Sequence, residues 1–87
     1  MTDILSETKD IIASVLKMPV ELLNEEAEMT DIAKWDSLRN VMILSGLEEH
    51  FGIVFPAEDI YDLTSVKALV EEVQKLLNKT GNEEKLL

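Results

Sequence analysis

Hydrophobic residues recur at helical spacing in three long stretches of the chain, which cover residues 2–18, 37–51 and 64–77. Pro19 ends the first stretch, because proline lacks the amide hydrogen that a continuing helix needs. Residues 56–61 add a shorter helix, which begins at a proline and carries acidic residues in its first turn. The pattern predicts an all-α fold, a small four-helix bundle of three longer helices and one short helix.

The helix over residues 37–51 carries hydrophobic residues on two faces. The face expected to pack on the core covers about 100° of arc. It holds Ile43, Leu44, Leu47 and Phe51. The nearly opposite face holds Leu38, Val41 and Met42, here called the Leu38 patch. A bundle this small readily buries only one face, so the Leu38 patch is predicted to be exposed and to dock a partner. The alternative is that loop residues cover it.

The segments between the helices are irregular. Residues 19–36 form a connection of a length that is uncommon in a small domain unless it is functional. Residues 53–55 are short enough to be a strand, but no second strand is available to pair with them, so a loop is expected. Residues 1–78 are predicted to form one domain and residues 79–87 a flexible tail.

Charge and composition narrow the function. The formal charge of −10 and the pI near 4.3 disfavour binding to nucleic acids and anionic membranes, both of which attract basic surfaces. The absence of cysteine excludes thiolate chemistry by the protein itself. No stretch reads as a membrane span or a secretion signal. Basic protein partners, a monomer and a cytoplasmic location are expected.

The start of the helix at residue 37 is the candidate site. Asp36 is a favoured N-cap, because its carboxylate can accept hydrogen bonds from the first free amides of the helix. Ser37 follows as the first helical residue, where the helix dipole and unpaired amides favour an attached anion. The position therefore suits a phosphodiester, although a capped helix start by itself needs no function.

Catalytic and metal-binding alternatives fit poorly. A serine hydrolase needs a base beside Ser37, but the single histidine, His50, lies roughly 20 Å along the same helix. His50 is expected at the helix end, where the dipole favours it. The acidic loop at residues 21–28 lacks the ligand spacing and the glycine of a calcium loop. No enzyme activity and no metal are predicted.

Several motifs in order resemble the acyl carrier protein family. They are Trp35-Asp36-Ser37-Leu38, the run from Leu44 to Ile53, Phe55-Pro56 and Leu63-Thr64-Ser65-Val66. The resemblance extends from the first helix to about Leu77. It implies a 4′-phosphopantetheine arm, supplied by coenzyme A and attached to Ser37 by a phosphopantetheinyl transferase. Asp36 and Leu38 flank that attachment.

The resemblance also implies partners and a pocket. The partners are acyl-loading ligases or ketosynthase-type enzymes with basic docking surfaces. The residues expected to meet them are Trp35, Arg39, Val41, Met42, Glu48, Glu49, Glu58 and Asp59. Trp35 has a second interpretation, as an aromatic lid over the loop. An acyl pocket, expected to be short or shallow, would be lined by Leu44, Leu47, Phe55, Ile60, Leu63 and Leu69.

The cargo stays open at this point. A carrier of fatty-acid, polyketide or related synthesis is the main interpretation. The alternatives are an aminoacyl or peptidyl carrier of a nonribosomal pathway, and an unmodified helical interaction module.

Overall fold

A computed structural model describes the backbone of residues 3–86 and the side chains of residues 3–78. Three α-helices form the body of the molecule: α1 (Ile4–Leu16), α2 (Ser37–Phe51) and α3 (Val66–Leu86). Three short 3₁₀ helices lie between them: η1 (Val20–Leu22), η2 (Met29–Asp31) and η3 (Ala57–Asp62). No strand occurs among the described residues, which confirms the all-α prediction and the loop at residues 53–55.

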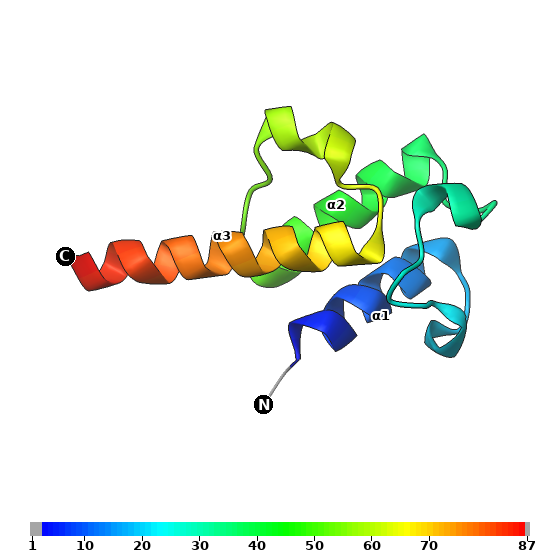
Figure 1. Ribbon diagram of the computed structural model, residues 1–87, viewed down its shortest axis with the longest axis horizontal. Coiled ribbons are helices and arrows are strands. Elements are labelled where there is room, and N and C mark those ends of the chain that lie inside the picture. Colours follow the sequence, from blue (N-terminus) through cyan, green and yellow to red (C-terminus); the bar gives the residue numbers. More distant parts are fainter. Residues whose placement is uncertain (1–2, 87) are drawn as a thin grey trace.

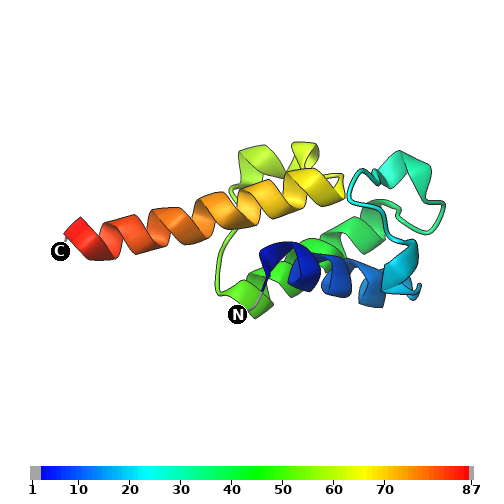
Figure 2. The same ribbon diagram turned by 60° about the horizontal axis from the view of Figure 1, so that its bottom comes forward.

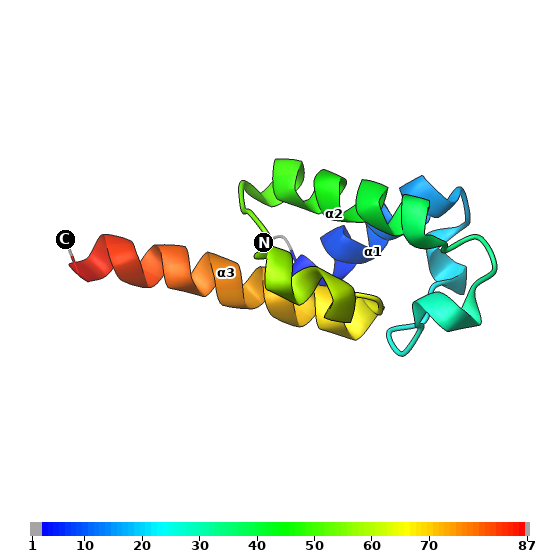
Figure 3. The same cartoon turned by 90° about the horizontal axis from the view of Figure 1, so that it is seen from above.

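The helices pack around one aliphatic core. In Figures 1 and 2, α1 and α2 lie side by side, and the first half of α3 covers them. Figure 3 shows η3 beside that first half of α3. Each helix contributes fully buried residues to the core, among them Ile12 and Leu16 of α1, Ile43 and Leu47 of α2, and Leu69 and Val73 of α3.

Local signals set the ends of α2 where the sequence predicts them. Asp36 is the N-cap, and the Arg39 amide donates to its Oδ1 at 2.8 Å. Gly52 ends the helix in the left-handed region, with φ of 66°, a conformation that glycine adopts without steric cost. At the start of α3, Ser65 Oγ accepts from the Ala68 amide at 3.1 Å, so Ser65 caps this helix.

Several predicted features differ from the structure. The first helix, α1, ends at Leu16, before Pro19, because Lys17 takes the left-handed conformation with φ of 56°. The short helix is a 3₁₀ helix shifted by one residue, because Pro56 precedes it in an extended conformation instead of starting it. Residues 29–31 form a 3₁₀ turn, η2, that the hydrophobic pattern did not predict; Glu28 and Asp31 each accept from the other's backbone amide there. The backbone of α3 is helical to Leu86. The flexibility of residues 79–87 stays a prediction.

The long connection between α1 and α2 is tied to the start of α3. The Met29 amide donates to Thr64 O at 2.8 Å, and the Val66 amide donates to Ala27 O at 3.1 Å. Glu28 and Ser65 form an isolated antiparallel bridge between them. These contacts fix the loop that leads into Ser37.

No helix within residues 3–86 is both long enough and apolar enough to cross a membrane.

Candidate functional site

Ser37 is the exposed first residue of α2, at the end of the molecule where the 19–36 loop returns to the bundle (Figure 1). Asp36 holds an extended conformation, with φ of −102° and ψ of −179°, that directs its carboxylate back onto the first turn. Its main-chain carbonyl accepts from the Asn40 amide at 2.8 Å. The hydroxyl of Ser37 therefore stands at the positive end of a well-capped helix of 15 residues.

Arg39 neutralises part of the charge beside Ser37. Its Nη1 lies 2.9 Å from Asp36 Oδ2, and both side chains are exposed. The hydrogen bond from the Arg39 backbone amide is the main cause that lowers the pKa of Asp36 from its ordinary value; desolvation opposes it, and the Arg39 guanidinium adds a smaller lowering effect. Arg39, predicted to meet partners, is thus paired within its own helix turn.

Trp35 lies in the core, which corrects its prediction as a docking residue. Its side chain is 2% exposed, and Nε1 donates to Asn40 Oδ1 at 2.9 Å. The Asn40 amide in turn donates from Nδ2 to Leu63 O at 3.2 Å. The indole N–H thus has a hydrogen-bond acceptor inside the core, as buried tryptophan usually does.

The Leu38 patch is exposed beside Ser37, as the angular count predicts. Leu38 is 70% exposed, Val41 59% and Met42 50%. Among the predicted docking acids, Glu49 and Glu58 are exposed and Asp59 is half-buried. Glu48 is different, because it is half-buried and its Oε2 accepts from the Phe55 amide at 2.8 Å. Glu48 therefore has a structural contact that leaves it less free for a partner.

A cavity of about 190 Å³, here called the Ser37 cavity, opens beside the serine between α2 and η3. Its lining residues are Met29, Ser37, Asn40, Val41, Ile60, Tyr61 and Thr64. Of the residues predicted to line an acyl pocket, Ile60 lies here. The other five, Leu44, Leu47, Phe55, Leu63 and Leu69, are at most 5% exposed and belong to the packed core.

Sequence reasoning missed Asn40 and Tyr61. Asn40 falls on the same helical face as Ile43, Leu44 and Leu47, so a polar residue in the core stripe was the available signal. Tyr61 is 88% exposed and lines the Ser37 cavity, and nothing in the local sequence marks it.

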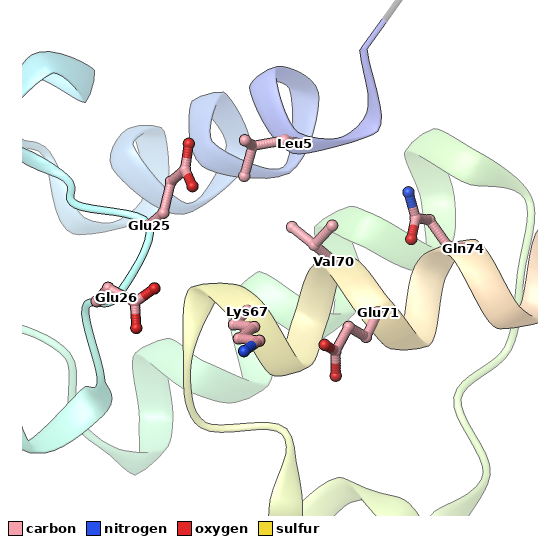
Figure 4. Close-up of a pocket in the computed structure, with 7 residues that line it drawn as sticks. All are labelled: Leu5, Glu25, Glu26, Lys67, Val70, Glu71 and Gln74. Atoms are coloured by element: carbon pink, nitrogen blue, oxygen red, sulfur yellow. The ribbon is translucent and has the colours of Figure 1, made fainter.

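A second hollow, of about 320 Å³, lies between α1, the acidic loop and α3 (Figure 4). Leu5 and Val70 give it an apolar side, and Glu25, Glu26 and Glu71 stand around it. No residue of α2 lines it, so it is separate from Ser37. Within residues 3–78, no group of three or more His, Asp or Glu side chains is arranged to hold a metal ion.

His50 lies at the other end of α2 from Ser37. Its Nε2 is 2.6 Å from Glu7 Oε1, so the only histidine of the chain joins α2 to α1. It is the last-turn basic residue of α2, where sequence analysis expected it.

Comparisons with known proteins agree with this geometry. The family model described as "Phosphopantetheine attachment site" matches residues 6–73. The non-reducing polyketide synthase pks11 of Talaromyces marneffei is 29% identical over 82 residues, which are 94% of this chain and 3% of that relative. The chain therefore spans only a small part of that relative's length. The solution structure of a holo acyl carrier protein from Geobacter metallireducens is 28% identical, with a TM-score of 0.79 and 90% of each chain covered.

The residues present fit a phosphopantetheine group. An exposed serine hydroxyl at a helix start can form a phosphodiester, and the dipole stabilises the resulting anion. Tyr61 and Thr64 bring hydroxyl groups to the adjacent cavity, where an arm containing amides can form hydrogen bonds. The chain belongs to the family of proteins that carry a phosphopantetheine attachment site, and phosphopantetheine is its prosthetic group.

Proposed function

We propose that the chain is a non-catalytic acyl carrier whose phosphopantetheine is attached to Ser37 Oγ and which passes acyl intermediates between enzymes of fatty-acid, polyketide or related synthesis. The observation that supports this most directly is the placing of Ser37. It is exposed at the capped start of α2, next to both the Leu38 patch and the Ser37 cavity, which share Val41. One hydroxyl thus lies next to both a docking surface and a place for an arm.

The other serines suit the attachment less well. Ser6 is also in a first helical turn, but its hydroxyl donates to Asp3 Oδ2 at 3.4 Å, so a phosphate there would stand against the carboxylate that caps α1. Ser65 Oγ is used to cap α3. Ser14 and Ser45 lie away from the helix starts, where the dipole offers an anion little. At Ser37 the neighbouring carboxylate is already paired with Arg39.

The chain's own residues position the arm and do not react. Asp36 fixes the first turn of α2, and Arg39 balances the charge beside the phosphodiester. When attached, the arm supplies a thiol that holds acyl groups as thioesters. No base is needed at Ser37, and His50 is roughly 20 Å away along α2.

Partners with basic docking surfaces suit the face around Ser37. The Leu38 patch offers apolar contact area, and the exposed Glu49 and Glu58 lie on the two elements that border the Ser37 cavity. We expect a phosphopantetheinyl transferase and then acyl-loading or ketosynthase-type enzymes to bind there. The similarities to a polyketide synthase and to an acyl carrier protein support this class of partner.

Intact mass tests the attachment. The chain is incubated with coenzyme A, magnesium and a broad-specificity phosphopantetheinyl transferase, together with Ser37→Ala and Ser45→Ala. The parent and Ser45→Ala are expected to gain one phosphopantetheine and Ser37→Ala none. Circular dichroism should show the same helix content in all three, because alanine is a good helix former and Asp36 still caps α2.

Two outcomes would contradict the proposal. A mass gain in Ser37→Ala would place the arm on another residue. No gain in the parent with several transferases would favour an unmodified interaction module that uses the Leu38 patch.

A further inference from the structure

The short helix η3 is attached to the core at its two ends and, along its own length, by the half-buried Ile60. None of its six residues is buried, and its N-cap, Pro56, provides no side-chain hydrogen bond. The residues on either side, Phe55 and Leu63, are each 4% exposed. Burial of these two side chains keeps η3 near the core, but apolar contact is not directional and does not fix its position along α2.

Two polar side chains of α2 form directional hydrogen bonds that can fix the position of η3 along this helix. Near the end of α2, Glu48 Oε2 accepts from the Phe55 amide at 2.8 Å, before η3 begins. Near its start, Asn40 Nδ2 donates to Leu63 O at 3.2 Å, where η3 ends. One helix therefore hydrogen-bonds to the main chain at both ends of η3.

Asn40 is suited to its place by the chemistry of its neighbours. The Trp35 indole can only donate, and the Leu63 carbonyl can only accept. A side-chain amide offers one acceptor and one donor group, so it satisfies both at once. Asn40 is 7% exposed, and a side chain lacking either group would leave a buried polar atom unpaired there.

We propose that Asn40 and Glu48 are positioning residues that hold η3 against α2 and so set the width of the Ser37 cavity. The cavity lies between these elements, with Ser37, Asn40 and Val41 on α2 and Ile60 and Tyr61 on η3. Its shape depends on the distance between the two helices. The importance of this cavity for an arm rests on the proposed function, whereas the holding of η3 does not.

Backbone order tests the positioning. Nitrogen-15 relaxation is measured on the full chain for the parent, Asn40→Asp and Glu48→Leu. At neutral pH an aspartate accepts from Trp35 but cannot donate to Leu63 O, and leucine cannot accept from Phe55. In both variants the order parameters of residues 57–62 are expected to fall from about 0.85 towards 0.6, with α1 and α3 unchanged.

Matched variants distinguish the effect of losing one hydrogen bond to η3 from a loss of order throughout the fold. Glu48→Gln keeps an oxygen that accepts from the Phe55 amide, so η3 should stay as ordered as in the parent. Trp35→Phe loosens the core but leaves the Asn40 bond to Leu63 in place, and η3 should again stay ordered. The proposal is overturned if η3 remains rigid in Asn40→Asp and Glu48→Leu, or if α1 and α3 lose order to the same extent.

The same samples also separate this proposal from the proposed function. If the parent gains no phosphopantetheine, the carrier function fails, while the relaxation data still decide whether Asn40 and Glu48 hold η3. If the parent is modified but η3 does not respond to the substitutions, the positioning role alone is rejected.

Discussion

Asp36 uses both carboxylate oxygens on the residue three positions ahead. Oδ1 accepts from the Arg39 amide at 2.8 Å, and Oδ2 lies 2.9 Å from the Arg39 guanidinium. The amide hydrogen bond is the largest cause of the lowered pKa of Asp36, and the positive charge of Arg39 adds to it. Both contacts favour the ionised carboxylate, so at the residue scale the cap of α2 is strongest when Asp36 is charged.

The stability contributed by this charge should depend on pH. Because the pKa of Asp36 is lower in the folded chain than its ordinary value of 3.8, the stabilisation is present above that value. It is lost as the pH falls through the folded-state pKa. We expect the free energy of unfolding of the parent to exceed that of Asp36→Asn at neutral pH, and the difference to shrink in acid.

Urea denaturation of both chains at neutral pH and at about pH 2.5 measures the effect. Asparagine is the matched control, because its amide oxygen also caps a helix but carries no charge. An equal difference at both pH values would show that the ionised form of Asp36 contributes nothing.

At the scale of the element, α2 is a helix with two apolar faces, one packed in the core and the other exposed to solvent. Leu47 on one face is fully buried, whereas Leu38 on the other is 70% exposed. The two residues have the same side chain in the same helix and differ mainly in their surroundings. The helix therefore contains its own control for separating folding from partner binding.

Leu47→Ala should affect mainly the stability of the fold, and Leu38→Ala mainly the modification by the transferase. Leu47→Ala leaves a cavity in the core and is expected to lower the free energy of unfolding by about 2–5 kcal/mol. Leu38→Ala should change it by about 0.5 kcal/mol or less, but should reduce kcat/KM of the transferase by about fivefold or more. Urea denaturation and modification kinetics measure the two. Unchanged kinetics in Leu38→Ala would remove the Leu38 patch from the docking surface.

At the scale of the whole molecule, the main electrostatic feature is a large negative net charge. The formal charge is −10, and the exposed Glu49 of α2 and Glu58 of η3 contribute to it. A surface of one sign raises the rate at which partners of the opposite sign associate, and dissolved salt screens that attraction over about 8–10 Å at physiological ionic strength.

Modification should therefore slow as salt is added. Raising the ionic strength from about 0.05 to 0.5 M is expected to lower kcat/KM of a basic transferase several-fold through KM, with kcat little changed. A chain with Glu49→Gln and Glu58→Gln should show a shallower dependence. Identical slopes for both chains would mean that these two acids do not guide the partner.

Features that depend on neighbours within a few residues could be predicted from the amino-acid sequence. The ends of α2 follow from the Asp36 cap and from Gly52, each of which acts within one turn. The buried and exposed faces of α2 follow from its 3.6-residue period. The position of Ser37 at a helix start, and with it the candidate site, was therefore readable from the chain.

The long-range hydrogen bonds of the polar and aromatic residues, in contrast, are seen only in the tertiary structure. Trp35 is a core residue whose indole donates to Asn40, and Asn40 donates to Leu63 O, which lies 23 residues further on. Glu48 similarly binds the main chain of the next loop and so is not simply a surface charge. Helical periodicity describes one element at a time, whereas these contacts depend on how separate elements pack.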